Sequence, residues 1–456
     1  MSATLEHELS TTGMRPAKGA RWLDASRSAA TIIFGPADTR NFAIRYWNSG
    51  VVEPSRGGRP AFTIILEHPG ALRSACLPPT ELRLAEAYIY GDLDIEGDLE
   101  AAAIVTAEVP GRLVQPGALY HLTRALLALP HSGSVHSGAR RSLGGARLSL
   151  PHSRRRDAAA IRSHYDVGNE FYELFLDERM VYSCAYFETG TETLDEAQRA
   201  KLEHICRKIR LKPGDRLLDI GCGWGGLIRY AAEAHGAIAL GITVSPAQAN
   251  LVRERIAAAG LADRCRVELC DYRELAPESP FDKIVSVGMA EHVGRRNLPE
   301  YFRQAFRLLR PGGLFLNHCI AHDRRERHLL ARVVAWRTGA FTKKYVFPDG
   351  QLASIDRLSR TALRAGLEVR DVESLREHYA RTLRDWVARL EAARDRAREL
   401  VGEETYRVWR LHTGGAAAAF AGGRLTIHQM LLARPDPAGH VPELPLTRQD
   451  IYCPVV

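Results

Sequence analysis

Two hydrophobic patterns alternate along the second half of the chain. Short apolar runs are separated by longer stretches in which apolar residues recur every three or four positions. The first pattern is typical of strands buried on both faces, and the second of helices that pack on one side. The predicted strands are 216–220, 237–244, 265–270, 282–287 and 314–319, and the helices between them include 195–209, 225–235, 246–259 and 298–309. This alternation predicts an α/β fold with a doubly wound, mostly parallel sheet.

The N-terminal part has a mixed pattern of short strands and helices. The predicted strands are 42–47 and 62–66, which are rich in β-branched and aromatic residues, and the predicted helices are 81–88 and 100–107. We therefore expect a smaller α+β domain at 26–130. Before it, residues 1–25 are expected to form a flexible tail.

Residues 131–156 break these patterns. Serine, glycine and arginine dominate, apolar periodicity is lost, and no acidic residue occurs. We place a basic linker at 131–157 and a larger domain at 158–456. The linker arginines are Arg140, Arg141, Arg147, Arg154, Arg155 and Arg156. Such a segment is either a solvated tether or a contact for anionic lipid head groups, and the sequence leaves both interpretations open.

Composition narrows the class of protein further. With 456 residues, 45% of them hydrophobic and 25% charged, the chain resembles a globular protein with two domains. No apolar run reaches membrane-spanning length, and residues 1–20 lack an apolar export signal, so a cytoplasmic location is expected. None of the eight cysteines forms a C-x-x-C pair, which predicts neither a zinc site nor a disulfide framework. The net charge of +8 would suit an anionic membrane surface or a nucleic acid.

The candidate chemistry begins where the first predicted strand of the larger domain meets a glycine-rich turn. Gly221, Gly223 and Gly226 match G-x-G-x-x-G, in which the backbone passes close to a ligand and the next helix offers free N–H groups. A dinucleotide would need an acidic residue at the end of the second strand, but 237–244 ends without one. The form Asp219-x-Gly-x-Gly-x-Gly is instead typical of turns that bind S-adenosylmethionine (SAM). A tight turn without a ligand is the alternative.

Further motifs follow in order over residues 160–430. They are HYDVGNEFY (164–172), YSCAYF (182–187), GITVS (241–245) with Gln248, DYR (271–273), GMAEHVG (288–294), NHCI (317–320) and YARTL (379–383). Together they resemble the cyclopropane-fatty-acyl-phospholipid synthases, and GDLDIEGDL (91–99) resembles the smaller domain of longer bacterial members. The resemblance implies a Rossmann-like SAM-dependent methyltransferase fold. Helical patterns at 323–338 and 381–400 would then cover its active site.

The activity implied by this resemblance is the transfer of a methylene unit from SAM to the cis double bond of an unsaturated phospholipid acyl chain. An isolated alkene is a weak nucleophile, so the reaction needs a strong electrophile, a base that removes one proton, and exclusion of water. In the family a bound bicarbonate ion is that base. Carried over to this chain, its holders are Cys184, Glu291, His318, Tyr379 and the main chain of Ile320. Taken alone, the cysteine would be a small buried apolar residue and the tyrosine a packing residue.

The resemblance also implies a set of SAM contacts. Tyr182 and Ser183 would close over the methionine moiety, and Asp219 would brace the turn. Tyr272 would stack on the adenine or simply pack. The full set is Tyr182, Ser183, Asp219, Gly221, Gly223, Thr243, Gln248, Asp271 and Tyr272.

Three other functions can be weighed against this sequence. A methyl- or methylene-branched product would form if the cation lost a different proton, although the intact bicarbonate set favours the ring. A methyltransferase for base amino groups would carry Asn/Asp-Pro-Pro-aromatic after the fourth strand, where this chain has VGMAE (287–291), so no nucleic-acid partner is expected. An inactive lipid carrier would leave the complete site unexplained.

One position departs from the family pattern. Many members carry a cysteine in the C-terminal segment, where this chain has Ala416, so a cysteine nucleophile is excluded there. The family further implies an unsaturated phospholipid as substrate, peripheral contact with a membrane surface, and a homodimer.

Overall fold

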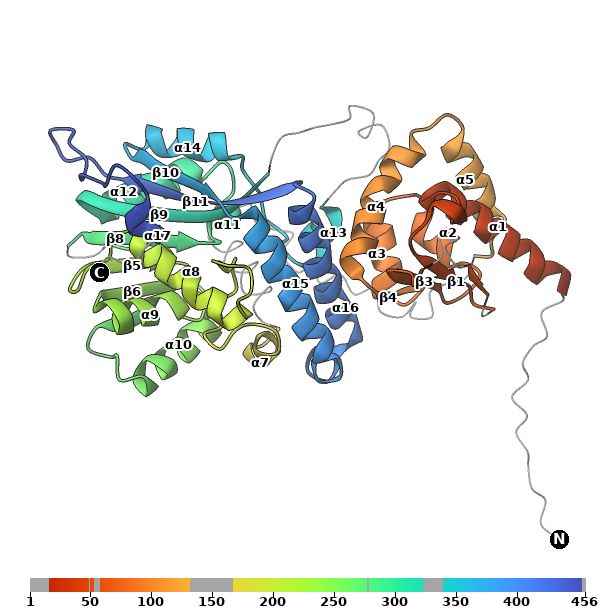
Figure 1. Ribbon diagram of the computed structural model, residues 1–456, viewed down its shortest axis with the longest axis horizontal. Coiled ribbons are helices and arrows are strands. Elements are labelled where there is room, and N and C mark those ends of the chain that lie inside the picture. Colours follow the sequence, from red (N-terminus) through yellow and green to blue (C-terminus); the bar gives the residue numbers. More distant parts are fainter. Residues whose placement is uncertain are drawn as a thin grey trace, which may run out of the picture. The chain divides into compact units, whose positions relative to one another are not determined.

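The computed structural model describes residues 16–48, 50–52, 58–131, 167–276, 279–322 and 339–452 (Figure 1). The chain divides into two compact units. Among the described residues, the N-terminal unit contains those up to His131 and the C-terminal unit those from Val167 onward. The expected linker beyond His131 and the expected helix at 323–338 lie outside the described residues.

The N-terminal unit is an α+β structure built on a four-stranded sheet. Its elements are α1 (Pro16–Phe34), η1 (Ala37–Thr39), β1 (Ala43–Arg45), β2 (Val51–Val52), β3 (Phe62–Leu66), α2 (Ala71–Cys76), α3 (Glu81–Ile89), β4 (Leu93–Gly97), α4 (Leu99–Leu113) and α5 (Ala118–Leu127). The strand order is β2-β1-β3-β4, with β1 parallel to β3 and the other pairs antiparallel. The rings of Phe42 and Phe62 stack at 4.6 Å between centroids and form part of its core.

The start of this unit differs from the expectation of a tail through residue 25. Residues 16–25 form the first half of helix α1. The buried face of this helix includes Ser26, Ala29, Ala30 and Ile33, which recur at helical spacing. Because three of these four side chains are small, the hydrophobic pattern is weak in the sequence although the face is buried.

The C-terminal unit contains the elements expected for the larger domain. They are α7 (Asn169–Glu173), α8 (Leu194–Lys208), β5 (Arg216–Ile220), α9 (Gly226–His235), β6 (Ile238–Thr243), α10 (Pro246–Ala258), β7 (Cys265–Leu269), β8 (Phe281–Val287), α11 (Ala290–Val293), α12 (Leu298–Leu308), β9 (Leu309–His322), α13 (Ala340–Tyr345), α14 (Ile355–Arg364), β10 (Glu368–Ser374), α15 (Arg376–Ala392), α16 (Arg394–Ala421), β11 (Leu425–Ala433) and α17 (Gln449–Tyr452). The five strands predicted from the apolar runs are all present.

These strands form a seven-stranded sheet in the order β10-β11-β9-β8-β5-β6-β7 (Figure 1). The five strands from β9 to β7 are parallel, whereas β11 and β10 add an antiparallel edge. Apolar residues of α8, α9 and α10 pack on one face, and those of α12 and α14 on the other. The predicted doubly wound, mostly parallel α/β fold is therefore confirmed.

The local sequence determines where helices α8 and α10 begin. Thr193 and Glu196 form a capping box at the start of α8. Ser245 accepts a hydrogen bond from the Gln248 amide at the start of α10, and Pro246 occupies the first turn. These caps determine where the two helices begin.

Two parts of the C-terminal unit differ from the sequence pattern. After residue 322 the sequence pattern predicts two helices and no strand, but this part of the chain also supplies β10 and β11. The predicted helix 381–400 is two helices, because α15 ends at Ala392 and α16 begins at Arg394. Within the described residues, no helix is both long and apolar enough to cross a membrane.

Candidate active site

The glycine-rich turn lies at the carboxyl end of β5 and is fixed to the neighbouring strand β6. The amides of Gly221 and Cys222 both donate to the Ile242 carbonyl at 3.0 Å. Gly225 has φ +75°, and a Cβ there would lie 2.8 Å from Val252 Cγ1. This position therefore requires glycine for both backbone conformation and space.

A second glycine is required on the adjoining strand. A Cβ on Gly241 of β6 would lie 2.7 Å from Cys222 Sγ and 2.8 Å from Ile228 Cδ1. The close approach of β6 to the turn and to α9 thus depends on the absence of a side chain. It leaves the backbone at Gly221 and Gly223 to line a pocket.

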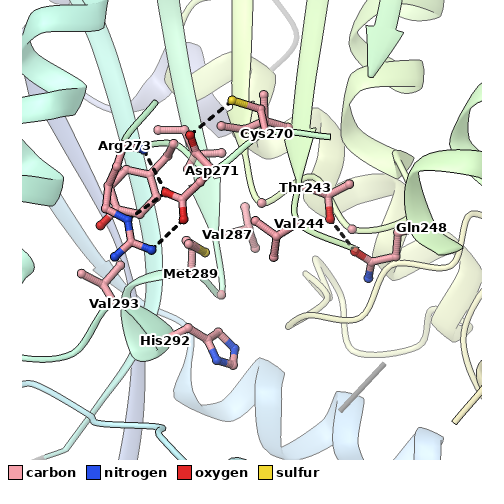
Figure 2. Close-up of a pocket in the computed structure, with 16 residues that line it drawn as sticks. Thr243, Val244, Gln248, Cys270, Asp271, Arg273, Val287, Met289, His292 and Val293 are labelled. Atoms are coloured by element: carbon pink, nitrogen blue, oxygen red, sulfur yellow. Dashed lines mark hydrogen bonds and ion pairs between the residues drawn. The ribbon is translucent and has the colours of Figure 1, made fainter. Parts of the chain in front are cut away.

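This pocket opens at the carboxyl ends of β5, β6 and β8 and encloses about 760 Å³, part of which is open to solvent (Figure 2). Six residues predicted as SAM contacts line it together: Gly221, Gly223, Thr243, Gln248, Asp271 and Tyr272. Its lining also includes Met289, His292 and Val293, which were not predicted. Burial lowers the pKa of His292 to about 4, so this imidazole is neutral at physiological pH.

Thr243 and Gln248 form one side of the pocket as a hydrogen-bonded pair (Figure 2). The Thr243 hydroxyl donates to Gln248 Oε1 at 2.8 Å and accepts from the Ser245 amide at 3.2 Å. Gln248 Nε2 is buried and has no hydrogen-bond partner among the described residues. An amide nitrogen is a donor only, so the pair presents an unsatisfied donor that suits a hydroxyl or ring nitrogen of a ligand.

Asp271 lies on the opposite side of the pocket, and its carboxylate is held by Arg273 (Figure 2). Arg273 Nε donates to Asp271 Oδ1 at 2.8 Å, and Arg273 Nη2 donates to Asp271 Oδ2 at 2.6 Å. The guanidinium also lies 5.5 Å from the centre of the Tyr272 ring, which contacts Tyr301 edge-on at 5.6 Å. Arg273 was not predicted as a site residue, yet it contacts both Asp271 and Tyr272.

The other three predicted SAM contacts lie in and around the buried interior beside the turn. Asp219 is buried near the end of β5, burial raises its pKa to about 7, and its Oδ1 has no hydrogen-bond partner among the described residues. Tyr182 stacks on Trp386 at 5.0 Å. The Ser183 hydroxyl accepts a hydrogen bond from Lys201 at 3.0 Å. The sequence prediction missed Lys201, a buried cation on the inward face of α8.

Glu291 lies in α11, directly after β8, with a buried carboxyl group. Its Oε1 accepts from the Ile320 amide at 2.6 Å, while Oε2 has no partner among the described residues. Burial raises the pKa of Glu291 from 4.5 to about 7. The structure thus brings two predicted residues together, but the Ile320 amide holds Glu291 rather than being left to bind an ion.

His318 lies on β9, on the same side of the strand as Ile320. Its Nδ1 is 3.2 Å from Nε2 of Gln429 on β11, the strand paired with β9 at this position. Because an amide nitrogen only donates, Nδ1 accepts and Nε2 carries the proton. His318 Nε2 is buried without a partner among the described residues, and burial, with the charges of Lys201 and Lys208, lowers its pKa well below the usual value. Gln429 was not predicted and orients this neutral donor.

Cys184 and Tyr379 meet through the main chain at the start of α15. The Cys184 thiol donates to the carbonyls of Ala185 and Leu375 at 3.2 and 3.7 Å, and the Tyr379 amide donates to the same Leu375 carbonyl at 3.0 Å. Burial raises the pKa of the Cys184 thiol, which is therefore neutral. Cys184 is fully buried. The Tyr379 ring packs against the Phe420 ring, with 4.7 Å between their centroids.

These residues border an apolar cluster between the sheet edge and the helices α7, α15 and α16. The cluster contains Cys184, and Ile320, Tyr379 and Ala416 pack against it. Aromatic rings make up much of it: Phe171, Tyr172, Phe175, Trp224, Trp386, Tyr406, Trp409 and Phe420. A polar group placed here is shielded from water, so each hydrogen bond to it is strengthened.

Comparisons with known proteins agree with this arrangement. Residues 152–430 match the family described as mycolic acid cyclopropane synthetase, and residues 31–108 match a domain of unknown function. A probable fatty acid methyltransferase of Pseudomonas putida is 43% identical over 396 residues, which cover 87% of this chain and 93% of that protein. The cyclopropane-fatty-acyl-phospholipid synthase of Escherichia coli K12 is 35% identical, over 64% of this chain and 72% of its own length.

A solved structure gives the same picture of the C-terminal unit. The crystal structure of the mycolic acid cyclopropane synthase CmaA1, complexed with SAH and CTAB, has a TM-score of 0.57 and 36% sequence identity. The match covers 60% of this chain and 97% of that one. It confirms the expected methyltransferase fold. The chain therefore belongs to the mycolic acid cyclopropane synthetase family.

Proposed function

We propose that this protein is an enzyme that transfers a methylene unit from SAM to the cis double bond of an unsaturated phospholipid acyl chain, forming a cyclopropane ring. SAM would bind in the pocket at the carboxyl ends of β5, β6 and β8. The pocket offers backbone at Gly221 and Gly223 and an unpartnered donor at Gln248 Nε2. The CmaA1 structure, crystallised with SAH, supports this assignment.

The proposed reaction can be followed through the bonds that form and break. The π electrons of the alkene would form a bond to the sulfonium methyl carbon, and the carbon–sulfur pair would leave with sulfur as S-adenosylhomocysteine. A positive charge would then remain on the neighbouring carbon of the acyl chain. Removal of a proton from the new methyl group would release the C–H pair, which closes the ring. Water must be absent because it would trap the cation as an alcohol.

One observation carries the proposal: Glu291 Oε2 and His318 Nε2 are buried polar atoms without partners among the described residues. The carboxylate oxygen would accept the hydrogen of a small oxyanion, and the imidazole N–H would donate to it. These residues therefore fit a bound bicarbonate ion, which would supply the base for ring closure. The Tyr379 and Cys184 side chains would border the ion, and the aromatic cluster would exclude water from it.

A branched product is the second candidate. The relative from Pseudomonas putida is named a probable fatty acid methyltransferase, which favours methyl or methylene branching of the acyl chain. In that case a proton would be lost from a neighbouring carbon of the acyl chain. Alternatively, the positive charge would move to another carbon before the proton was lost. The ring is favoured if the proton leaves the new methyl group, and the ion held by Glu291 and His318 would be the base that removes it.

The direct test is incubation of the full chain with SAM and vesicles of an unsaturated phospholipid, followed by mass analysis of the acyl chains. A gain of one CH2 supports the proposal, and nuclear magnetic resonance of the product distinguishes ring from branch by the ring protons. Vesicles of a saturated phospholipid are the matched control because they offer no alkene. Absence of any gain with the unsaturated lipid, under conditions where SAM binds, would refute the proposed activity.

We also propose that the enzyme reaches its substrate as a peripheral protein on an anionic membrane surface, through the basic linker 131–157. Each arginine near such a surface contributes about 1 kcal/mol of attraction. Replacing Arg154, Arg155 and Arg156 by serine should weaken binding to anionic vesicles, most strongly at low salt. Unchanged vesicle binding would leave the linker as a plain tether.

A further inference from the structure

The inward face of α8 carries polar side chains where a helix usually buries apolar ones. Gln198, Lys201 and Lys208 are all buried, and Lys201 is only 2% exposed. Burying an ammonium group costs several kcal/mol unless it is compensated. Lys208 is compensated by ion pairs with Glu373 and Asp371. Lys201 has no carboxylate of the described residues within ion-pair distance, so its burial calls for another explanation.

Lys201 instead contacts the segment that was predicted to close over the methionine moiety of SAM. Its Nζ donates to Ser183 Oγ at 3.0 Å. One helical turn earlier, Gln198 Nε2 donates to the Ser183 carbonyl at 2.8 Å and to the Val181 carbonyl at 3.1 Å. Two residues of α8 thus hold both the main chain and the side chain of Ser183.

This contact determines what the Ser183 hydroxyl can offer a ligand. An ammonium group has three donors and no acceptor, so the hydroxyl oxygen must be the acceptor. The hydroxyl hydrogen is then directed away from Lys201 and is available to an acceptor on a ligand. A carboxylate is the acceptor that gains most from a neutral O–H beside a buried positive charge.

The charge of Lys201 also acts on the rest of the site. Burial lowers its pKa to about 8, and the nearby carboxyl groups of Asp177 and Asp219 oppose that change. In turn, Lys201 is the charge that counteracts the raised pKa of Asp219 beneath the glycine turn. The positive charge of Lys201 is therefore close enough to interact with Asp219, which lies beneath the glycine-rich turn.

We propose that Lys201 is a positioning residue for the methionine carboxylate of SAM, which it serves by orienting the Ser183 hydroxyl as a donor and by adding a positive charge behind it. This inference rests on the proposed function, since it takes SAM as the ligand. It assigns Lys201 no contact with the reacting carbons. Its role is confined to the amino-acid end of SAM.

The test compares two ligands that differ by one group: SAM and decarboxylated SAM. Their dissociation constants are measured by calorimetry for the wild type and for Lys201→Met, which keeps the length of the side chain and removes the charge. The wild type should bind SAM more tightly than decarboxylated SAM. Lys201→Met should weaken SAM binding about tenfold or more and change binding of decarboxylated SAM by less than twofold, because only SAM has the carboxylate.

Two further variants keep the test decisive. Ser183→Ala should reduce the same ligand preference, and it leaves the buried charge in place, so it is informative even if Lys201→Met folds poorly. Lys208→Met is the matched control: it removes a buried lysine of the same helix and should lower stability without changing the preference between the ligands.

The outcomes separate this inference from the proposed function. A wild type that binds neither ligand would overturn the proposed function itself. A wild type that prefers SAM, together with Lys201→Met and Ser183→Ala variants that keep the full preference, would overturn only the role of Lys201. Equal loss of preference in Lys208→Met would also overturn it, because the effect would then belong to any buried charge on α8.

Discussion

Replacing Glu291 by glutamine is expected to make the protein more stable at pH 8 while removing most of its turnover. The Glu291 carboxyl is buried, and its Oε1 accepts from the Ile320 amide at 2.6 Å. Glutamine keeps an acceptor for that amide but has no charge to bury. The substitution therefore isolates the cost of an ionised carboxylate in this place.

The magnitude follows from the raised pKa of Glu291. Burial raises this pKa from 4.5 to about 7, so the folded protein holds the proton more tightly than the unfolded chain does. The stability due to this group is complete below about pH 4.5 and is lost as the pH rises through about 7. Between pH 5 and pH 8 the loss is about 2–3 kcal/mol, a cost that glutamine does not have.

The assay is urea unfolding at pH 5 and pH 8, in buffer free of bicarbonate, for the wild type, Glu291→Gln and Glu254→Gln. Glu254 is an exposed residue of α10 and serves as the control for loss of one charge. The advantage of Glu291→Gln over the wild type should grow by about 2–3 kcal/mol from pH 5 to pH 8, while Glu254→Gln shows no such change. SAM affinity should stay the same and turnover fall about 100-fold. An advantage that is equal at both pH values would refute the reasoning.

Three other substitutions test separate parts of the site. Gln248→Leu removes the unpartnered donor in the pocket and should weaken SAM binding about tenfold, measured by calorimetry, with little change in unfolding free energy. Gln429→Leu removes the donor to His318 and should lower kcat about tenfold without changing the dissociation constant of SAM; a loss confined to SAM affinity would contradict that role. Gly225→Ala places a methyl group 2.8 Å from Val252 Cγ1 at φ +75° and should lower the free energy of unfolding by about 1–3 kcal/mol, whereas an unchanged denaturation midpoint would argue against the turn geometry.

Much of the C-terminal fold could be predicted because its central strands are buried on both faces. The strand 216–220 matches β5 at both ends, since an apolar run ending in a glycine turn has few other structures available. Strand β10, by contrast, lies at the edge of the sheet and has no fully buried residue in Glu368–Ser374. It therefore carries no apolar run, and the sequence pattern gave no reason to expect a strand there.

The residues of the candidate site could be predicted where they belong to short sequence motifs. The family resemblance implied Thr243, Gln248 and Asp271 as SAM contacts. Thr243 ends β6, Gln248 follows it and Asp271 follows β7, so all three lie at the carboxyl edge of the sheet, where they line one pocket. Lys201 and Gln429 act across the tertiary structure, on residues 18 and 111 positions away. Nothing local marks such partners. Only the presence of a lysine on the apolar face of α8 could have drawn attention to Lys201.

The central claim is that a proton leaves the transferred methyl group itself, taken by a base held beside Glu291 and His318. The most direct measurement uses SAM with a trideuterated methyl group and vesicles of an unsaturated phospholipid, followed by mass and resonance analysis of the acyl chain. The account predicts a cyclopropane ring whose new carbon keeps two deuterium atoms. A product whose new carbon keeps all three would contradict it, because the proton would then have been lost from the acyl chain.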